Sequence, residues 1–344
     1  MCLKLPKKDL EEICVFYAEN DLNLEGSEFL ITGATGFIGS WLTEALIALD
    51  LEFDLRMSIT CLVRNVGKAS RLFSDNHLRN LHLIETDLRH PQSFDRDFSH
   101  VIHAATPTSE SSRAGDLDNI YSSSVLGSKN ILSALSTRGN TPVFLHTSSG
   151  AVYGDQPLDL ERIPLSSPMK WPDDLDSIRN LYAFSKLETE RIVLEAHSQG
   201  KILGINARLF SFMGPRLPLD QHYAIGNFIW DVYKEGKVRV TGDGKSVRSY
   251  LHASNMAMQI LYLLSEKISG ASHVGSDEGR TLGEWAELVS GTFGAQIEIL
   301  NEKSDLVTRY VPERDIRIPI NINSEEHYRE KFISWMDWLN SRGI

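Results

Sequence analysis

The chain has 344 residues, of which 42% are apolar and 24% charged, a balance typical of a globular protein with two domains or one large α/β domain and an appendage. Its formal net charge is −11 and no basic stripe offsets it, so nucleic acid is not expected as a partner, because phosphate binding needs clustered Lys and Arg. No apolar run reaches the roughly 18 residues that span a bilayer, and the N-terminus lacks a signal-peptide pattern, so we expect no membrane partner.

The first 26 residues are expected to form an N-terminal helical extension. Leu10, Ile13, Cys14 and Tyr17 recur at helical spacing, which predicts an amphipathic helix. A helix that covers the core is the simpler interpretation, and a helix that binds a partner is the alternative.

Strands then alternate with helices as far as residue 210. The sequence predicts strands at 28–32, 58–64, 81–86, 100–105, 143–149 and 202–210, and helices at 37–49, 119–136 and 180–198. Because this alternation implies parallel pairing with right-handed crossovers, the fold class is predicted as α/β, with a Rossmann-type doubly wound parallel sheet over 27–210.

The pattern changes from about residue 211, where Gly, Pro and loops become frequent. Helices are predicted at 281–294 and 329–341, with Trp335 and Trp338 in the core. We expect 211–344 to form mainly a smaller α+β substrate domain, with a segment at about 250–265 returning to the first domain.

The cysteines and histidines give no sign of a metal site. Cys2, Cys14 and Cys61 lack metal-ligand spacing, and the eleven His are scattered. The thiols are predicted to be reduced, in a cytoplasmic protein.

Three glycines follow the first predicted strand, in "TGATGFIG". Gly33 permits a sharp turn, Gly36 lets phosphates approach the backbone, and Gly39 lets the helix pack close to the sheet. A helix N-terminus carries unpaired N–H groups and a partial positive charge, so the pattern predicts a dinucleotide site.

Two residues at later strand ends bear on the cofactor. Arg64 stands where an acid would bind the ribose of NAD, which favours NADP; a solvated surface charge is the alternative. Asp87 follows the third strand, where it either contacts the adenine or simply forms a turn.

The segment "LYAFSK" supplies Tyr182 and Lys186 on one helical face. A nearby ammonium favours the phenolate, so Tyr182 can exchange a proton near neutral pH. The fifth strand ends in Thr147, Ser148 and Ser149, on the sheet edge where open α/β sheets bind ligands.

Together, "TGATGFIG", "HAAT", "SSGAVYG", "YAFSK", "ARLFSFMGPR" and "GDGKSVRSYLH" resemble the extended short-chain dehydrogenase/reductase family over about residues 27–300. Within it, the chain is similar to the NAD-dependent epimerase/dehydratase group, which acts on nucleotide-diphosphate sugars.

The resemblance implies roles for individual residues. Ser149 would hydrogen-bond the reacting sugar oxygen, Tyr182 would be the acid/base, and Lys186 its electrostatic partner. Arg248 would hold the diphosphate and Asn227 the nucleotide; a structural ion pair and a helix N-cap are the respective alternatives. The cofactor, NADP or NAD, would contact Gly33, Thr35, Gly36, Phe37, Ile38, Gly39, Arg64, Asp87, Leu88, Ala104, Ala105, Thr106, Tyr182 and Lys186.

Three segments depart from the family pattern. Gly150 and Ala151 stand where family dehydratases carry an Asp-Glu pair and decarboxylases a Glu, which disfavours a 4,6-dehydratase. Ser124 replaces an Asn, and Ser211 and Met213 stand where Asn and Tyr are frequent.

The leading hypothesis is a nucleotide-diphosphate-sugar epimerase or 4-ketosugar reductase with hydride transfer at a sugar carbon, usually C4. A reductase of a non-nucleotide carbonyl would leave Arg248 unexplained, and a non-catalytic dinucleotide-binding regulator would not need Tyr182 and Lys186. Relatives dimerise through helices such as 120–136 and 181–198, so a homodimer is expected.

Two further features flank the expected site. Residues 169–180 form a predicted surface loop, with a lid as the alternative interpretation. His103, His146 and His252 are expected to be hydrogen-bonded polar residues rather than catalysts.

Overall fold

The computed structural model describes residues 4–73, 80–106, 117–135, 139, 141–221, 223–300, 307–320 and 324–342. The chain divides into two compact units. The first contains Met1–Gly154, Met169–Leu209 and Ala257–Ser272, and the second contains Asp155–Pro168, Phe210–Met256 and His273–Ile344. The segment that returns to the first unit is therefore 257–272, and residues 155–168, expected in the first domain, belong to the second unit.

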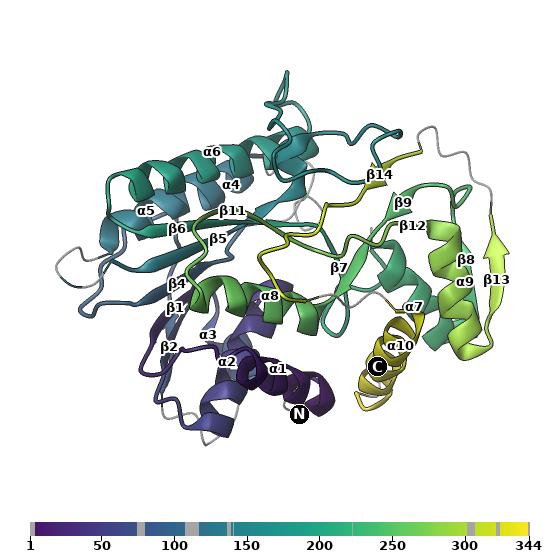
Figure 1. Ribbon diagram of the computed structural model, residues 1–344, viewed down its shortest axis with the longest axis horizontal. Helices are drawn as coiled ribbons and strands as arrows, with labels where there is room; N and C mark the ends of the chain where they lie inside the picture. Colours follow the sequence, from purple (N-terminus) through teal and green to yellow (C-terminus); the bar gives the residue numbers. More distant parts are fainter. Residues whose placement is uncertain are drawn as a thin grey trace. The chain divides into compact units, whose positions relative to one another are not determined.

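A seven-stranded sheet organises the first unit (Figure 1). Its spatial order is β11-β6-β5-β4-β1-β2-β3, with bounds β1 Glu28–Thr32, β2 Ser58–Val63, β3 Leu81–Glu85, β4 His100–His103, β5 Val143–Ser149, β6 Leu203–Leu209 and β11 Gly270–Val274. The six predicted strands are confirmed, and β11 is an additional strand that the sequence reading missed. The order reverses between β1 and β4, which pair in parallel with Thr32 opposite His103, and ligands of open α/β sheets bind at such a point.

Helices cover both faces of this sheet, on one side α4 Leu117–Tyr121, α5 Gly127–Ala134 and α6 Ile178–Ser198, and on the other α2 Phe37–Phe53, α3 Val66–Leu72 and α8 Ala253–Ser265 (Figure 1). The strands are buried on both faces, which is why they read as continuous apolar runs. The core between the sheet and the first helix layer includes Leu30, Val101, Phe144, Ile131 and Val193.

The helix predicted over 119–136 is not continuous. A π-helical segment, Ser122–Leu126, separates α4 from α5. The Ser128 hydroxyl of α5 donates to the carbonyl of Ser124, inside this segment, at 2.5 Å. Such a bond from a serine back to the preceding turn competes with the regular helical ladder, and π-helical turns occur frequently at functional sites.

The N-terminal helix, α1 Lys7–Glu19, belongs to the first unit and packs on α2. Ile13 and Tyr17 are buried in this contact, and the backbone N–H of Leu5 donates to the Glu44 carboxylate at 2.9 Å. These contacts are those of a helix that covers the core of the first unit.

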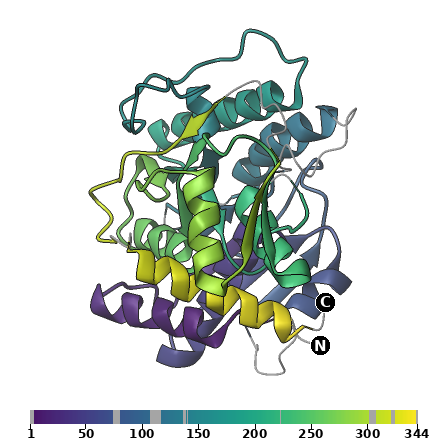
Figure 2. The same ribbon diagram turned by 90° about the vertical axis from the view of Figure 1, so that its right-hand side faces the viewer.

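The second unit is a smaller α+β assembly. Its sheets have two or three short strands: β7 Ser211–Met213 with β10 Tyr250–His252; β8 Lys237–Val240 with β13 Gln296–Ile299; and β9 Val247–Arg248 with β12 Arg280–Thr281 and β14 Arg309–Tyr310. The helices are α7 Ala224–Glu235, α9 Leu282–Phe293 and α10 Glu325–Asn340. In Figure 2, α9 and α10, yellow-green and yellow, pack together. Trp335 and Trp338 of α10 are buried, as predicted.

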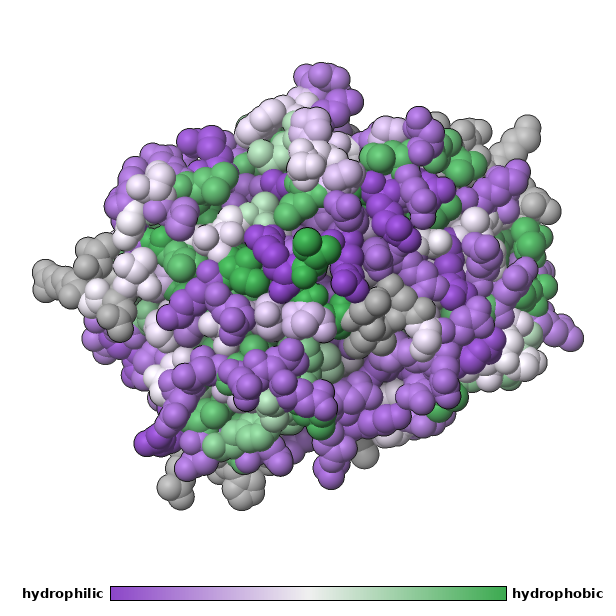
Figure 3. Space-filling model, in the orientation of Figure 1, coloured by the Kyte–Doolittle hydropathy of each residue, from purple (hydrophilic) through white to green (hydrophobic). Residues whose placement is uncertain are grey.

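The visible surface in Figure 3 is mostly hydrophilic, with apolar side chains in small scattered groups. Among the helices that the structure describes, none combines the length and the apolar character that a membrane crossing requires.

Candidate active site

The turn between β1 and α2 has the backbone geometry that its glycines suggested. Gly33 has a φ of +71°, and a Cβ on it would lie 2.5 Å from the carbonyl oxygen of Ala104, at the end of β4. A Cβ on Gly39 would collide with the backbone of Gly33. These two positions therefore require glycine for the turn and for the close packing of helix on strand.

Gly36 is exposed, unlike Gly33 and Gly39. Among the described residues, a Cβ on Gly36 would meet one atom outside its chain neighbours within 4 Å, the carbonyl oxygen of Gly33 at 3.3 Å. It is the N-cap residue of α2, whose first turn carries no acidic side chain. The space in front of this helix N-terminus is thus open to an anion, and the cradle fits the pyrophosphate of a dinucleotide. Thr35, Phe37 and Ile38 border Gly36 in the same turn and are partly exposed.

The segment after β4 is fixed beside this turn. The backbone N–H groups of Ala104 and Ala105 donate to the carbonyl and the hydroxyl of Thr32 at 3.3 and 3.2 Å. The His103 ring bonds both to the Thr32 hydroxyl and to the Ser128 hydroxyl, each at 2.9 Å. Burial, followed by the nearby Lys186, lowers the pKa of His103 to about 3, so the ring is neutral. The expectation of a hydrogen-bonded His103 is confirmed.

The two predicted cofactor residues on later strands occupy different surroundings. Arg64 follows β2 and is exposed. Asp87 lies in the turn after β3, where Arg89 pairs with its carboxylate at 2.5 Å and lowers its pKa to about 2. The turn interpretation of Asp87 thus has direct contacts in its support, and an adenine contact stays a prediction. Leu88, the next residue, accepts a hydrogen bond from Asn130 of α5 at 2.8 Å.

Lys186 lies within the first unit between β5 and its own helix, α6. Ser177 caps α6 by accepting from the Asn180 N–H at 3.0 Å, so Tyr182 falls near the start of the helix and Lys186 one turn later. The Lys186 ammonium lies 5.6 Å from the centroid of the Tyr182 ring and donates to the carbonyl of Thr147 at 2.5 Å. Lys186 is only 2% exposed, and burial lowers its pKa to about 7, although Glu190 acts in the opposite direction.

Ser149 is the last residue of β5 and caps the 3-10 helix Gly150–Tyr153. Its hydroxyl oxygen accepts from the N–H of Ala151 at 3.1 Å, which fixes the side chain at the strand end. Because α6 packs against both β5 and this 3-10 helix, the structure brings Ser149, Tyr182 and Lys186 onto neighbouring elements of the first unit. The arrangement suits proton exchange with a substrate hydroxyl beside a dinucleotide.

A buried ion pair behind these residues escaped the sequence analysis. Arg208 of β6 binds Glu190 of α6 through Nε at 3.0 Å and Nη2 at 2.8 Å. The Ser148 hydroxyl donates to the same carboxylate at 2.5 Å, and Arg208 Nη1 donates to the Tyr153 hydroxyl at 2.6 Å. The position of Glu190, one helical turn after Lys186, was the only signal in the sequence.

The other two histidines differ from each other. His252, in the second unit, bonds the Ser254 hydroxyl through Nδ1 at 2.8 Å, in line with expectation. For His146, the expectation of a hydrogen-bonded side chain is wrong: within the described part of the chain, neither ring nitrogen has a partner. Burial lowers the pKa of His146 well below its ordinary value, so the buried ring is neutral, and its centroid lies 6.0 Å from that of the His103 ring.

Asn227 and Arg248 lie in the second unit. Asn227 is inside α7 rather than at its N-cap, which is Tyr223, so the capping alternative is wrong. Its amide instead holds the backbone of Gln221, donating at 2.6 Å and accepting at 3.2 Å. Arg248 donates to the carbonyl and hydroxyl of Thr308 at 3.2 and 2.7 Å.

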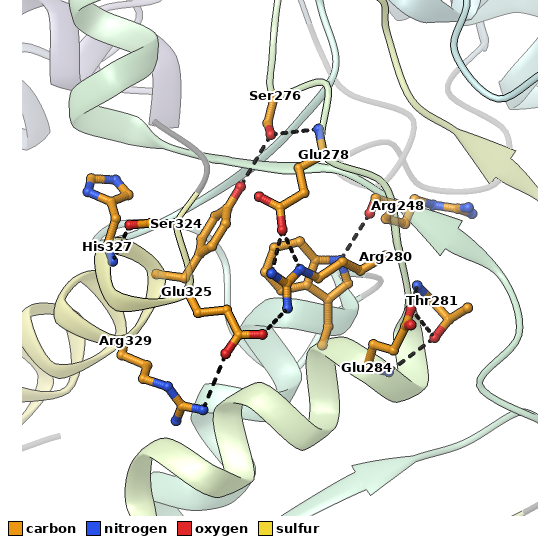
Figure 4. A network of polar contacts seen from close by, with 12 residues as sticks. Arg248, Ser276, Glu278, Arg280, Thr281, Glu284, Ser324, Glu325, His327 and Arg329 are labelled. Atoms are coloured by element: carbon orange, nitrogen blue, oxygen red, sulfur yellow. Dashed lines mark hydrogen bonds and ion pairs between the residues drawn. The ribbon is translucent and has the colours of Figure 1, made fainter. Parts of the chain in front are cut away.

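In Figure 4, the Arg248 guanidinium points away from a second arginine, Arg280, which contacts Glu278 and Glu325. The backbone carbonyl of Arg248 accepts from the Trp285 indole at 2.9 Å. The bond from Trp285 fixes the backbone of β9. The Arg248 side chain extends away from Arg280 and its two glutamates (Figure 4).

Metal ligation has no candidate group. Within the residues that the structure describes, no group of three or more His, Cys, Asp or Glu side chains could hold a metal ion.

Comparison with protein families gives one match, to the NAD dependent epimerase/dehydratase family, over residues 29–275. Among curated proteins, UDP-glucuronic acid decarboxylase 2 of Arabidopsis thaliana is 25% identical over 284 residues, which are 81% of this chain and 60% of that protein. The chain spans about three fifths of the length of the first curated relatives it matches.

Solved structures are similar over nearly the whole chain. A UDP-N-acetylglucosamine 4-epimerase from Methanobrevibacter ruminantium M1, in complex with UDP-N-acetylmuramic acid, has a TM-score of 0.76 and 21% identity, covering 93% of this chain and 100% of that one. A UDP-glucuronic acid 4-epimerase from Bacillus cereus, in complex with UDP-glucuronic acid and NAD, has a TM-score of 0.69 and 20% identity, covering 91% and 99%. At these identities the likeness shows the fold.

Proposed function

Because the chain belongs to the NAD dependent epimerase/dehydratase family, we propose that it oxidises or reduces a carbon of a nucleotide-diphosphate sugar, as an epimerase or as a 4-ketosugar reductase. The observation that carries the proposal is the buried Lys186 ammonium, which lies 5.6 Å from the Tyr182 ring and is anchored on the strand that ends in Ser149. A buried cation beside a phenol stabilises the phenolate, so Tyr182 can act as the acid/base.

Each residue of the site has a separate proposed role in the reaction. Tyr182 takes the proton of the sugar hydroxyl at C4 during oxidation and returns it during reduction. Ser149, fixed by its bond from Ala151, hydrogen-bonds the same sugar oxygen. A nicotinamide dinucleotide, when bound, supplies the hydride acceptor or donor. Gly33 and Gly36 admit its phosphates to the N-terminus of α2.

Elimination and decarboxylation are disfavoured, although the curated relatives include UDP-glucuronic acid decarboxylases. Gly150 and Ala151 follow Ser149 in the 3-10 helix and have no side chain that can transfer a proton. Oxidation or reduction at C4 needs a proton transfer, for which Tyr182 is proposed, and a hydride transfer, which the bound nicotinamide dinucleotide would carry out.

In the second unit, Arg248 is proposed to bind the diphosphate and Asn227 the nucleotide. Arg248 is partly exposed on β9, and a guanidinium suits bidentate binding of phosphate oxygens. The Asn227 side-chain amide hydrogen-bonds the backbone of Gln221, which holds it in place for the proposed contact with the nucleotide. A homodimer through the helices at 120–136 and 181–198 belongs to the same proposal.

The exposed Arg64 favours NADP and hence the reductase, which releases its cofactor in each turnover. An epimerase instead keeps NAD bound, because oxidation and reduction occur in one site. The nucleotide that co-purifies with the protein, identified by mass spectrometry, separates the two: retained NAD supports the epimerase and an empty site with NADPH affinity the reductase.

Turnover tests the proposal directly. The protein is incubated with UDP- and dTDP-hexoses or their 4-keto forms, with NAD or NADPH, and the products are separated by chromatography. We expect Tyr182→Phe to lower the rate by about 100-fold or more while dinucleotide affinity changes little, because only the proton transfer is lost. Full activity in Tyr182→Phe would contradict the assigned role, and reduction of simple ketones alone would point to a non-nucleotide substrate.

A further inference from the structure

Four buried side chains form what we term the Glu190 cluster: Ser148 of β5, Tyr153 of the 3-10 helix, Glu190 of α6 and Arg208 of β6. The Glu190 carboxylate accepts from Arg208 at 3.0 and 2.8 Å and from the Ser148 hydroxyl at 2.5 Å. Arg208 also donates to the Tyr153 hydroxyl at 2.6 Å, and its guanidinium lies 5.0 Å from the centroid of that ring. The cluster therefore links four elements of the first unit.

Its charges are almost fully removed from water. The side chains of Glu190 and Arg208 are 1% and 7% exposed. A buried ion pair adds little net stability, because the cost of removing both charges from water offsets their attraction. The Ser148 hydroxyl donates to the Glu190 carboxylate and the Tyr153 hydroxyl accepts from Arg208, so the two buried side chains are held in one geometry.

The cluster adjoins the catalytic residues along the chain and in space. Glu190 lies one helical turn after Lys186, and residues four apart on a helix have Cβ atoms about 5–6 Å apart. Ser148 immediately precedes Ser149, and Thr147 before it accepts the Lys186 hydrogen bond. On α6, Tyr182 therefore lies one turn before Lys186 and Glu190 one turn after it.

We infer that Glu190, held by Arg208 and Ser148, is a positioning residue that keeps the Lys186 ammonium protonated and so sets the pH at which Tyr182 ionises. This role rests on the proposed function of Tyr182 as the acid/base, which it deepens. Among the described residues, the titratable groups facing Lys186 are Tyr182 and Glu190 on α6, His103 on β4 and His146 on β5. Burial keeps both histidines neutral, so Glu190 is the carboxylate that can stabilise the ammonium.

The test is Glu190→Gln, with Glu188→Gln as the matched control. Glu188 lies on the same helix and is 18% exposed, and its partner Arg191 is 54% exposed, so the control removes the same charge from a pair that solvent reaches. The readout is the phenolate absorbance of Tyr182 near 295 nm, taken for each full-length protein as the difference from the same protein carrying Tyr182→Phe. This measurement needs neither substrate nor turnover, so it tests the inference even where the sugar reaction fails.

We expect Glu190→Gln to move the Tyr182 midpoint up by about 1 pH unit, because Lys186 loses its stabilising anion and its proton more readily. Glu188→Gln is expected to leave the midpoint within about 0.2 units, because solvent screens that site. Arg208→Gln removes the cation that offsets Glu190, so we expect the Tyr182 midpoint to move down. Opposite directions for the two partners of one ion pair separate an electrostatic effect from a general loss of packing.

Glu190→Gln leaves Arg208 unpaired in the core, so folding is checked by thermal unfolding. The double variant Glu190→Gln/Arg208→Gln buries no unpaired charge, and we expect it to fold with a midpoint above the parental value, because Glu190 is the charged partner that raises the pKa of Lys186. An unchanged midpoint in the folded Glu190 variants would overturn the inference. So would equal upward shifts in Glu190→Gln and Arg208→Gln, which would indicate structural disruption alone.

Discussion

Replacing Gly36 with alanine separates dinucleotide binding from folding at the turn between β1 and α2. Within the part of the chain that the structure describes, the new Cβ would meet the carbonyl oxygen of Gly33 at 3.3 Å, and a shift of a few tenths of an ångström relieves this contact. The φ and ψ angles at Gly36, −80° and 175°, are allowed for alanine. We therefore expect the free energy of unfolding to change by less than about 1 kcal/mol, the usual difference between glycine and alanine near a helix N-cap.

Dinucleotide binding should respond much more strongly. The methyl group would occupy the open side of the helix N-terminus, where the phosphates meet the backbone amides. A hydrogen bond to a charged group contributes about 1.5–3 kcal/mol, so losing one or two of them costs about 3 kcal/mol. At about 1.4 kcal/mol per tenfold change, NAD or NADP affinity should fall about 100-fold.

The assay is calorimetric titration of NAD and NADPH, together with urea unfolding. Gly226→Ala is the matched control, because its Cβ would also lie 3.3 Å from a carbonyl oxygen, that of Pro218, but in α7 of the second unit. Parental dinucleotide affinity in a folded Gly36→Ala protein would refute the placement of the phosphates at this turn. Gly33→Ala and Gly39→Ala should instead impair folding, because their methyl groups would collide with backbone atoms.

Two further predictions concern charged residues of the first unit. Arg64→Asp should lower NADPH affinity relative to NAD by about tenfold or more, because a carboxylate repels a 2′-phosphate and accepts from ribose hydroxyls; an unchanged ratio in equilibrium titrations would count against a ribose contact. Lys186→Met should be more stable than the parent at pH 6.5, by a few kcal/mol in urea unfolding, and the difference should shrink by pH 9.5. The pKa of Lys186 is about 7 in the folded protein and 10.5 for a free lysine. Between these two pH values the unfolded chain binds more protons than the folded one, so the stability of the parent rises with pH. A stability difference that does not depend on pH would contradict the burial of a titrating ammonium.

The elements that the sequence predicted correctly are those whose signals are local. Strands β1 to β6 and helices α2 and α6 follow from apolar runs and helical spacing, and the glycine turn follows from the strand before it and the helix after it. Strand β11 was missed because "GASHV" is short, contains small and polar residues, and lies beyond the regular alternation. The π-helical segment Ser122–Leu126 was missed because it depends on side-chain bonds within an otherwise helical pattern.

The candidate site was likewise predictable from the sequence where it depends on short segments. The spacing of Tyr182 and Lys186 and the placement of Ser149 at a strand end are properties of short segments. The partners of Glu190 are not: Ser148 and Arg208 lie 42 and 18 residues away, and they meet only because β5, α6 and β6 pack together. The missing partners of the His146 ring likewise became visible only with its neighbours in place.

The sequence by itself determined the order of strands and helices, the glycine turn and the helical face shared by Tyr182 and Lys186, because these depend on residues within about one or two turns of each other. The tertiary structure decided the protonation of Lys186 and the neutrality of His103, since burial and long-range neighbours set them. It also decided that Glu190 and Arg208, on different elements, meet as one buried ion pair. A pKa reflects every charge and every water molecule removed from the surroundings of a group, and no local pattern records these.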